Sequence, residues 1–309
     1  MRNSIQSFVT FLVVLIAGSS CSSNALKSEK QPDLILSVNA YSFADLLAAK
    51  DNRNNEQVYT LFNLRDWCAD HHIEALDPTA YFFPTYPEVP SDEYLAQFKN
   101  KASKLGIAIS GTGIRNNFAS PDSSIRAGGV QLAKNWMVAA SKMGAPVLRV
   151  FAGEIPKGYE DNWEVPAGWM IECYKELIPF AEQYKVKIGI QNHGDMLQTA
   201  AQCKYILDSV DSEWAGLIVD TGNFKTDDPY KDIAEVVPYA FNWQVKESVF
   251  GIGNEIETDY NRLVQIVKDG GYKGYFPVET LLVRGKNYDP FQLVPNILDK
   301  LKKAMDEVY

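Results

Sequence analysis

Side chains able to transfer a proton or bind an oxygen follow several short apolar runs of this chain. The residues concerned are Gln191, Asn192, His193, Asp220, Gln244, Lys246 and Glu279. Because imidazole titrates near neutral pH, His193 can act as an acid or a base, although it could equally anchor a loop. Lys246 can bind a carbonyl or hydroxyl oxygen, or it can simply pair with Glu279.

Eight short β-branched runs, separated by longer amphipathic stretches, carry these polar groups at their ends. We expect strands at Leu34–Asn39, Ile73–Leu76, Ile107–Gly111, Val147–Phe151, Lys187–Gln191, Gly216–Asp220, Asn242–Lys246 and Tyr275–Glu279. Their starts are about 25 to 40 residues apart, which leaves room for one helix and two loops each. No linker rich in Gly and Ser interrupts residues 33–309. The pattern therefore predicts one (β/α)8 TIM barrel of the α/β class. A doubly wound open sheet is the alternative, but Val38–Leu47 lacks the glycine-rich loop that usually follows its first strand.

Helix start and stop signals fit this reading. Ser91 precedes a helix that Gly106 ends, Asp122 precedes one that Gly144 ends, and Pro290 begins the last.

In a TIM barrel, the chemistry lies at the carboxyl ends of the strands. Strand alternation should place Asn242, Gln244 and Lys246 on one face, and polar groups that face an aliphatic interior need partners or a ligand. Asp195 and Asn223 are expected only to cap helices or loops.

Residues at the ends of the first strands are candidates for substrate binding. They are Tyr41, Arg115, Arg149 and, from the fifth strand end, Asn192. Arg149 could hold a sugar or a carboxylate, or form a structural ion pair with Asp77 or Glu154. An aromatic cluster at strand ends 1 to 3 could stack on sugar faces or form a loop core; it comprises Tyr41, Phe43, Tyr81, Phe82, Phe83, Tyr86 and Phe118.

The N-terminus reads as a targeting segment. Phe8–Ala17 is an apolar run too short to span a bilayer, and Gly18, Ser19 and Ser20 lead into Cys21. This resembles a bacterial lipoprotein signal, in which the cysteine is lipidated and becomes the first residue. We expect a signal peptide at 1–20, a tether at 21–32 and a periplasmic or outer-membrane location in the cell envelope. A plain secretory peptide cut near Ser20 is the alternative.

The composition of the chain restricts which molecules it can bind. A net charge of -9 and a pI near 5.0 weigh against nucleic acid. Cys68, Cys173 and Cys203 lie in helical patterns without the spacing of a metal knuckle, so we expect buried thiols. We expect membrane contact only through the lipid anchor.

The order of motifs resembles the xylose-isomerase-like barrels of the sugar phosphate isomerase/epimerase type, in particular a secreted Bacteroidetes-type branch. The resemblance covers about residues 33–302 and rests on Ser37–Phe43, Asp77–Tyr81, Gly111–Arg115, Leu148–Gly153, Asn192–Gly194, Val219–Asn223 and Val278–Thr280. It implies one divalent metal ion bound by residues of strands 5 to 8, which here are Gln191, Asp220, Gln244 and Glu279. The similar enzymes carry Glu on strand 5 and His on strand 7, so two of the four implied ligands are changed.

These two changes affect both metal and mechanism. An oxygen-only set with two negative charges suits Mg2+, Mn2+ or Ca2+ and disfavours zinc. The resemblance implies a keto-sugar or saccharide isomerase or epimerase that forms a metal-stabilised enediolate, with Glu279 as base and His193 and Lys246 assisting. A related carbohydrate lyase or hydratase is also open. The alternative is a non-catalytic barrel that binds saccharide at the cell envelope, because a glutamine cannot act as the second base. An abasic-site endonuclease on the same fold is disfavoured by the acidic charge and by the presence of only 3 His.

Overall fold

The computed structural model of the chain describes residues 34–50, 56–283 and 287–309. The expected signal peptide and tether, with Cys21, lie outside the described residues, and the described part belongs to one compact unit, Asp33–Tyr309.

All strand pairs of the barrel are parallel. The strands are β1 (Leu34–Asn39), β2 (Ala75–Asp77), β3 (Ala108–Ile109), β4 (Thr112–Gly113), β5 (Val147–Phe151), β6 (Lys187–Gln191), β7 (Ala215–Asp220), β8 (Ala240–Gln244) and β9 (Gly274–Val278). They pair in two runs, β3-β2-β1-β9 and β4-β5-β6-β7-β8.

Two connections close these runs into a ring. β3 and β4 follow one another along a single segment; β3 lies within the expected strand Ile107–Gly111, and β4 lies just beyond its end. On the other side, the backbone of Val245 bonds to β9 and just beyond it: its N–H donates to the carbonyl of Pro277 at 2.8 Å and its carbonyl accepts from Glu279 at 3.0 Å. The eight-stranded barrel is therefore confirmed, and the open doubly wound sheet is excluded.

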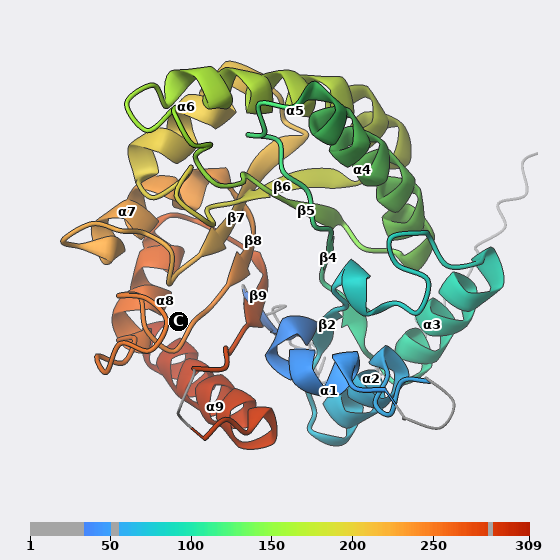
Figure 1. Cartoon of the computed structure of the whole chain (residues 1–309). Coiled ribbons are helices and arrows are strands. Elements are labelled where there is room, and N and C mark those ends of the chain that lie inside the picture. The colour runs from blue at the N-terminus through green and yellow to red at the C-terminus, as the bar shows by residue number, and fades with distance from the viewer. Residues whose placement is uncertain (1–33, 51–55, 284–286) are drawn as a thin grey trace, which may run out of the picture. The chain divides into compact units, whose positions relative to one another are not determined.

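Helices form an outer ring around the strands (Figure 1). They are α1 (Ala44–Ala48), α2 (Leu61–Asp70), α3 (Asp92–Lys104), α4 (Ser123–Met143), α5 (Glu164–Tyr184), α6 (Ala200–Val210), α7 (Pro229–Val236), α8 (Tyr260–Asp269) and α9 (Pro290–Val308). The predicted caps are confirmed: the side chains of Ser91 and Asp122 accept backbone bonds at the starts of α3 and α4. Gly144 ends α4 with φ 83°, a left-handed conformation that favours glycine.

Strand register sets the height of the polar residues. Asp220 of β7 pairs with Gln244 of β8, so their side chains lie at the same level of the barrel. The expected strand Asn242–Lys246 ends earlier, at Gln244, so Lys246 lies in the loop beyond it. That loop places the lysine beside the carboxyl ends of β7 and β9, between Asp220 and Glu279.

The core lies between the strands and the helix ring, and it includes Trp136, Trp243 and Phe276. Cys68, Cys173 and Cys203 are buried free thiols on α2, α5 and α6, as predicted. In the described ranges, no helix is long and apolar enough to cross a membrane.

Candidate active site

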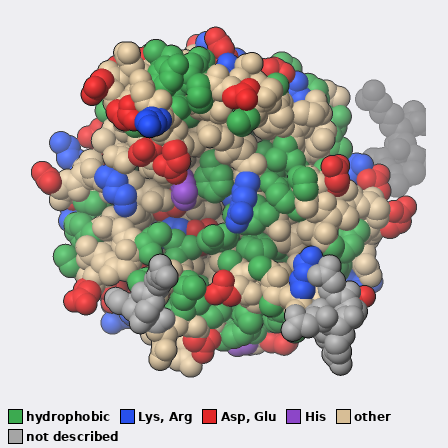
Figure 2. Space-filling view, viewed as in Figure 1, with side chains coloured by type: hydrophobic (Ala, Val, Ile, Leu, Met, Phe, Trp, Pro, Cys, Tyr) green, Lys and Arg blue, Asp and Glu red, His purple; other side chains and the backbone are tan. Residues whose placement is uncertain are grey.

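A cavity of about 560 Å³ opens at the carboxyl ends of the strands. Figure 2 shows this face as a hollow that contains charged side chains and a histidine, with apolar side chains around them. The lining residues from the predicted site are Tyr41, Arg115, Arg149, Gln191, His193, Asp220, Gln244, Lys246 and Glu279. The strand-end reasoning therefore brings nine of its ten cavity candidates together, because parallel strands end at one face.

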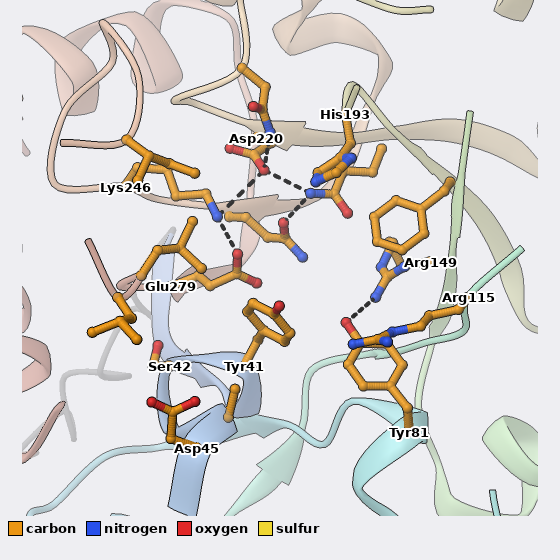
Figure 3. A pocket seen from close by; sticks show the side chains of 18 of the residues that line it. Tyr41, Ser42, Asp45, Tyr81, Arg115, Arg149, His193, Asp220, Lys246 and Glu279 are labelled. Carbon is orange, nitrogen blue, oxygen red and sulfur yellow. Dashed lines mark hydrogen bonds and ion pairs between the residues drawn. The ribbon is translucent and has the colours of Figure 1, made fainter. Parts of the chain in front are cut away.

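Lys246 sits between two buried carboxylates on the floor of the cavity (Figure 3). Its Nζ forms an ion pair with Glu279 and lies 3.4 Å from Oδ2 of Asp220. Lys246 is 5% exposed, Asp220 0% and Glu279 6%, so water screens these charges little. Burial disfavours the ammonium, but the two carboxylates outweigh that effect and raise the pKa of Lys246.

Glu279 follows β9 and is positioned by the bond from its backbone N–H to Val245. Burial raises the pKa of its carboxyl, although Lys246 acts in the opposite direction. Its Oε1 pairs with Lys246. The expected pairing of Lys246 and Glu279 is present, and it does not preclude contact of either group with a ligand, because both line the cavity.

The carboxylate of Asp220 is surrounded by donors from the protein. Oδ2 accepts from the Gln191 and Asn223 amides, each at 2.7 Å, in addition to the ammonium of Lys246, and Oδ1 accepts from the backbone of Gly222 at 3.2 Å. Both oxygens therefore have protein partners.

The two glutamines are hydrogen-bonded to one another. Nε2 of Gln191 donates both to Asp220 and to Oε1 of Gln244. Oε1 of Gln191 is buried and has no hydrogen-bond partner among the described residues. Because a buried unpaired acceptor is costly, this oxygen is suited to a donor from a ligand in the cavity.

Asn192 and Asn223 exchange the roles expected for them. Nδ2 of Asn192 donates to the Asp220 carbonyl at 3.0 Å and its Oδ1 accepts from the Asp220 backbone at 2.7 Å, so this buried side chain joins β6 to β7 away from the cavity. Asn192, expected to bind substrate, is therefore not among the residues that line this cavity. Asn223, expected to be a cap, lines the cavity and bonds to Asp220.

The opposite wall is formed by aromatic rings and two arginines. Arg149, on β5, donates to the Ile114 carbonyl at 2.6 Å and to the Tyr81 hydroxyl at 3.1 Å, and its guanidinium lies 3.9 Å from the Phe151 ring centre. Its Nε has no partner among the described residues. Arg149 is thus held by the Ile114 carbonyl, the Tyr81 hydroxyl and the Phe151 ring, and no contact between Arg149 and Asp77 or Glu154 is among those that hold it.

Arg115 stacks 4.4 Å above the ring of Tyr81 and is exposed at the rim. Tyr41 meets the same ring edge-on at 6.0 Å, and its backbone N–H bonds to the side chain of Asn39 at 2.8 Å. In the aromatic cluster, Tyr41 and Tyr81 line the cavity. The other members do not: Phe43, Phe82, Phe83 and Phe118 are core, and Tyr86 bonds to the Arg115 backbone.

His193 lies on the loop after β6, at the open side of the cavity, with its ring 4.7 Å from that of Phe151. Loss of hydration lowers its pKa; Asp220 opposes the shift, whereas Arg149 and Lys246 reinforce it. A neutral imidazole at the mouth can accept a proton.

Several lining residues were not predicted from the sequence. They are Ser42, Ala44, Asp45, Phe151, Asn223, Ile252, Leu281, Leu282 and Tyr288. Phe151 is the last residue of β5 and could have been found by its place at a strand end. Ile252, from the long loop after β8, carries no polar signal in the sequence.

The residues present do not fit the divalent metal ion that the resemblance implies. Among the described residues, no three side chains of His, Cys, Asp or Glu are grouped so that they could hold a metal ion. Within the implied set, the ammonium of Lys246 lies between Asp220 and Glu279, and Gln191 presents an N–H to the carboxylate of Asp220. A donor set for a cation needs lone pairs at its centre, whereas this set has N–H groups there.

The model of a family described as xylose isomerase-like TIM barrel matches residues 66–304. No curated protein sequence matches the chain. Among solved structures, D-psicose 3-epimerase with D-tagatose from Clostridium cellulolyticum H10 is similar, with a TM-score of 0.67 at 16% identity over 89% of this chain and 98% of that one.

Two further structures are similar at the same level. A D-tagatose 3-epimerase-like protein has a TM-score of 0.67 at 15% identity, covering 88% of this chain and 98% of its own. The IolI protein with a bound zinc atom has a TM-score of 0.68 at 13% identity, covering 89% of this chain and 99% of its own. At these identities the likeness shows a shared fold.

Proposed function

The chain belongs to the xylose isomerase-like TIM barrel family, and from this premise we propose that it is a carbohydrate isomerase or epimerase acting on a keto-sugar or saccharide. The reaction moves a proton at the carbon beside a carbonyl group. The proposal draws on the epimerases that share the fold and on the chemistry of the cavity floor.

One observation carries the proposal: a buried carboxylate and a buried ammonium, Glu279 and Lys246, face the same cavity as an ion pair. Proton removal beside a carbonyl needs a base at the carbon and a positive group at the oxygen, where negative charge develops. Glu279 supplies the first and Lys246 the second. His193, at the open side, is placed to exchange a proton with the substrate or with water.

The remaining wall suits a sugar. Tyr41, Tyr81 and Phe151 offer ring faces on which the C–H face of a sugar can stack. Oε1 of Gln191, which has no partner among the described residues, can accept a hydrogen bond from a sugar hydroxyl. The metal-stabilised form of this reaction, expected from the resemblance, gains no support from these residues.

The test is exchange of substrate protons with solvent. The purified protein is incubated in D2O with D-fructose, D-tagatose and D-psicose, and the carbon-bound protons beside the carbonyl are followed by proton NMR. We expect loss of one such signal, accompanied by a new isomer. Loss of the signal with an unsaturated product instead would identify a lyase or hydratase, in which a leaving group departs from the next carbon.

A second function, a saccharide-binding barrel without catalysis, is favoured by the neutral Gln191 and Gln244 on the cavity floor, because neither can act as a second base. Saturable sugar binding without any deuterium incorporation would establish it and would overturn the enzymatic proposal.

A further inference from the structure

We propose that the ammonium of Lys246 takes the place of a divalent metal ion in this barrel and, resting on the proposed function, that it stabilises the negative oxygen of the reacting sugar.

The ammonium of Lys246 lies between the two carboxylates. Nζ of Lys246 is paired with Glu279 and lies 3.4 Å from Asp220, so one cation bridges carboxylates that come from the ends of β7 and β9. Figure 3 shows the ammonium between the two acids, directed into the cavity. A second cation bound to the same oxygens would be repelled by this ammonium at close range and low dielectric.

The ammonium also sets the net charge of the cavity floor. Gln191, Gln244, Asp220 and Glu279 together carry two negative charges, which the ammonium reduces to one. The amide of Gln191 also donates to Asp220 at 2.7 Å, which a carboxylate at that position could not do. The neutral glutamines therefore match a floor on which a single positive charge leaves only one net negative charge.

The backbone of Lys246 is held by two threonine side chains. Its backbone N–H donates to Oγ1 of Thr221 at 2.9 Å and its carbonyl accepts from Oγ1 of Thr258 at 3.0 Å. A Cβ at position 222 would come within 2.9 Å of Cγ of Lys246, so Gly222 leaves room for the lysine stem. The loop after β8 thus fixes a side chain that would otherwise be mobile.

The chemistry follows from this arrangement. The carboxylate of Glu279 takes the proton as the C–H bond beside the carbonyl breaks. The electron pair of that bond forms the C=C bond, and the C=O π pair moves to the oxygen. Lys246 donates a hydrogen bond to this oxygen and remains protonated. A proton from water, relayed by His193 at the open side, returns to the other face of the carbon and re-forms the carbonyl, and the acid of Glu279 releases its proton to water, so no oxidant or reductant is needed.

The first experiment uses the wild-type protein after dialysis against EDTA. Mn2+ is titrated by calorimetry, and deuterium exchange into the keto-sugars is measured with and without EDTA. We expect no stoichiometric Mn2+ binding in the micromolar range and exchange that EDTA leaves unchanged. One Mn2+ per chain bound at micromolar concentration would overturn the inference, as would exchange that EDTA abolishes and Mn2+ restores.

The second experiment uses Lys246→Ala, with Lys225→Ala as the control. The Nζ of Lys225 contacts the Gly222 carbonyl at 3.4 Å and lies beside the site without bridging the carboxylates. We expect Lys246→Ala to gain Mn2+ binding and to lose exchange by about 10²–10³-fold, the usual cost of removing a donor to a developing oxyanion. Added methylammonium should restore part of the exchange, which a purely structural role would not allow. The control should gain no Mn2+ binding.

If Lys246→Ala does not fold, Lys246→Gln replaces it, because glutamine keeps most of the side-chain volume without the charge. The Mn2+ titration of the wild-type protein tests the inference independently of both variants. The two proposals fail differently. Absence of Mn2+ binding together with absence of exchange on any sugar supports the assignment of the cation position to Lys246 and overturns the enzymatic function. Exchange that depends on a metal ion supports the enzymatic function and overturns the assignment of the cation position to Lys246.

Discussion

Nε2 of Gln191 lies 2.7 Å from Oδ2 of Asp220, so the side chain at the end of β6 acts as a hydrogen-bond donor to the acid at the end of β7. The pair is buried, with Gln191 2% and Asp220 0% exposed. A carboxylate at position 191 would face the acid of Asp220 at the same distance without an N–H to offer. This makes glutamine the residue that the local charges favour.

Gln191→Glu should therefore destabilise the barrel by about 2–3 kcal/mol. The change removes a hydrogen bond to a charged group and brings a second carboxylate against a buried one. Urea unfolding at neutral pH measures the difference. Gln131→Glu on α4, where the glutamine is exposed, is the matched control and should change stability by no more than about 0.5 kcal/mol. Equal stability of the two variants would show that the Gln191–Asp220 bond does not hold the floor together.

Glu279→Gln should fold and lose proton exchange. The amide keeps an oxygen for the Lys246 ammonium and nearly the same volume, but it cannot accept the substrate proton. Loss of a positioned general base costs about 10²–10⁴-fold in rate.

Deuterium incorporation into the keto-sugar measures this effect, and circular dichroism verifies the fold. Glu257→Gln removes an exposed glutamate that pairs with Lys300 and should exchange as fast as the wild type. Wild-type exchange in Glu279→Gln would move the role of base to His193.

The fold was predictable because its signals are local. The runs at Leu34–Asn39, Val147–Phe151 and Lys187–Gln191 have the same bounds in the structure, since each is a β-branched segment between turn residues. The predicted strand Asn242–Lys246 extends too far, because the pairing of β8 with β7 ends at Gln244. The backbone of Val245 bonds to β9 instead, and this bond depends on residues more than 30 positions away.

Candidate site residues were predictable as a group, because strand ends meet at one face. Their contacts were not. Lys246 could bind a substrate oxygen or pair with Glu279. Only the distances from its Nζ to Asp220 and Glu279 in the folded protein show that the ion pair is present. The position of Asn192 was not predictable either: its neighbour His193 lines the cavity, whereas the Asn192 side chain bonds to the Asp220 backbone.

Cys21→Ser should release the protein from membranes. We propose that Cys21 is lipidated after removal of residues 1–20, as the sequence pattern indicates. Expression in a bacterial host, followed by separation of membrane and soluble fractions, measures the distribution. The control is Cys68→Ser: Cys68 is a buried thiol on α2 and should have no effect on attachment. A membrane-bound Cys21→Ser protein would contradict lipidation at this residue.

Asp77, at the end of β2, should make the stability of the protein fall as pH rises. Burial raises the pKa of its carboxyl to about 7; Arg149 opposes this shift and Glu279 adds to it. Because the folded state then holds the proton more tightly than the unfolded chain, the stabilisation is complete below about pH 4. This stabilisation is lost between about pH 4 and pH 7, and above about pH 7 Asp77 no longer changes the stability with pH.

Asp77→Asn is neutral at every pH and removes this dependence. Relative to the wild type, its free energy of unfolding should increase by about 2.5 kcal/mol from pH 5 to pH 8, given a shift of about 3 pKa units. Urea unfolding of both proteins at the two pH values measures the change. The control is Asp70→Asn, because Asp70 is an exposed acid at the end of α2. A difference between Asp77→Asn and wild type that is the same at pH 5 and pH 8 would mean that Asp77 is ionised throughout, and that Arg149 compensates fully for its burial.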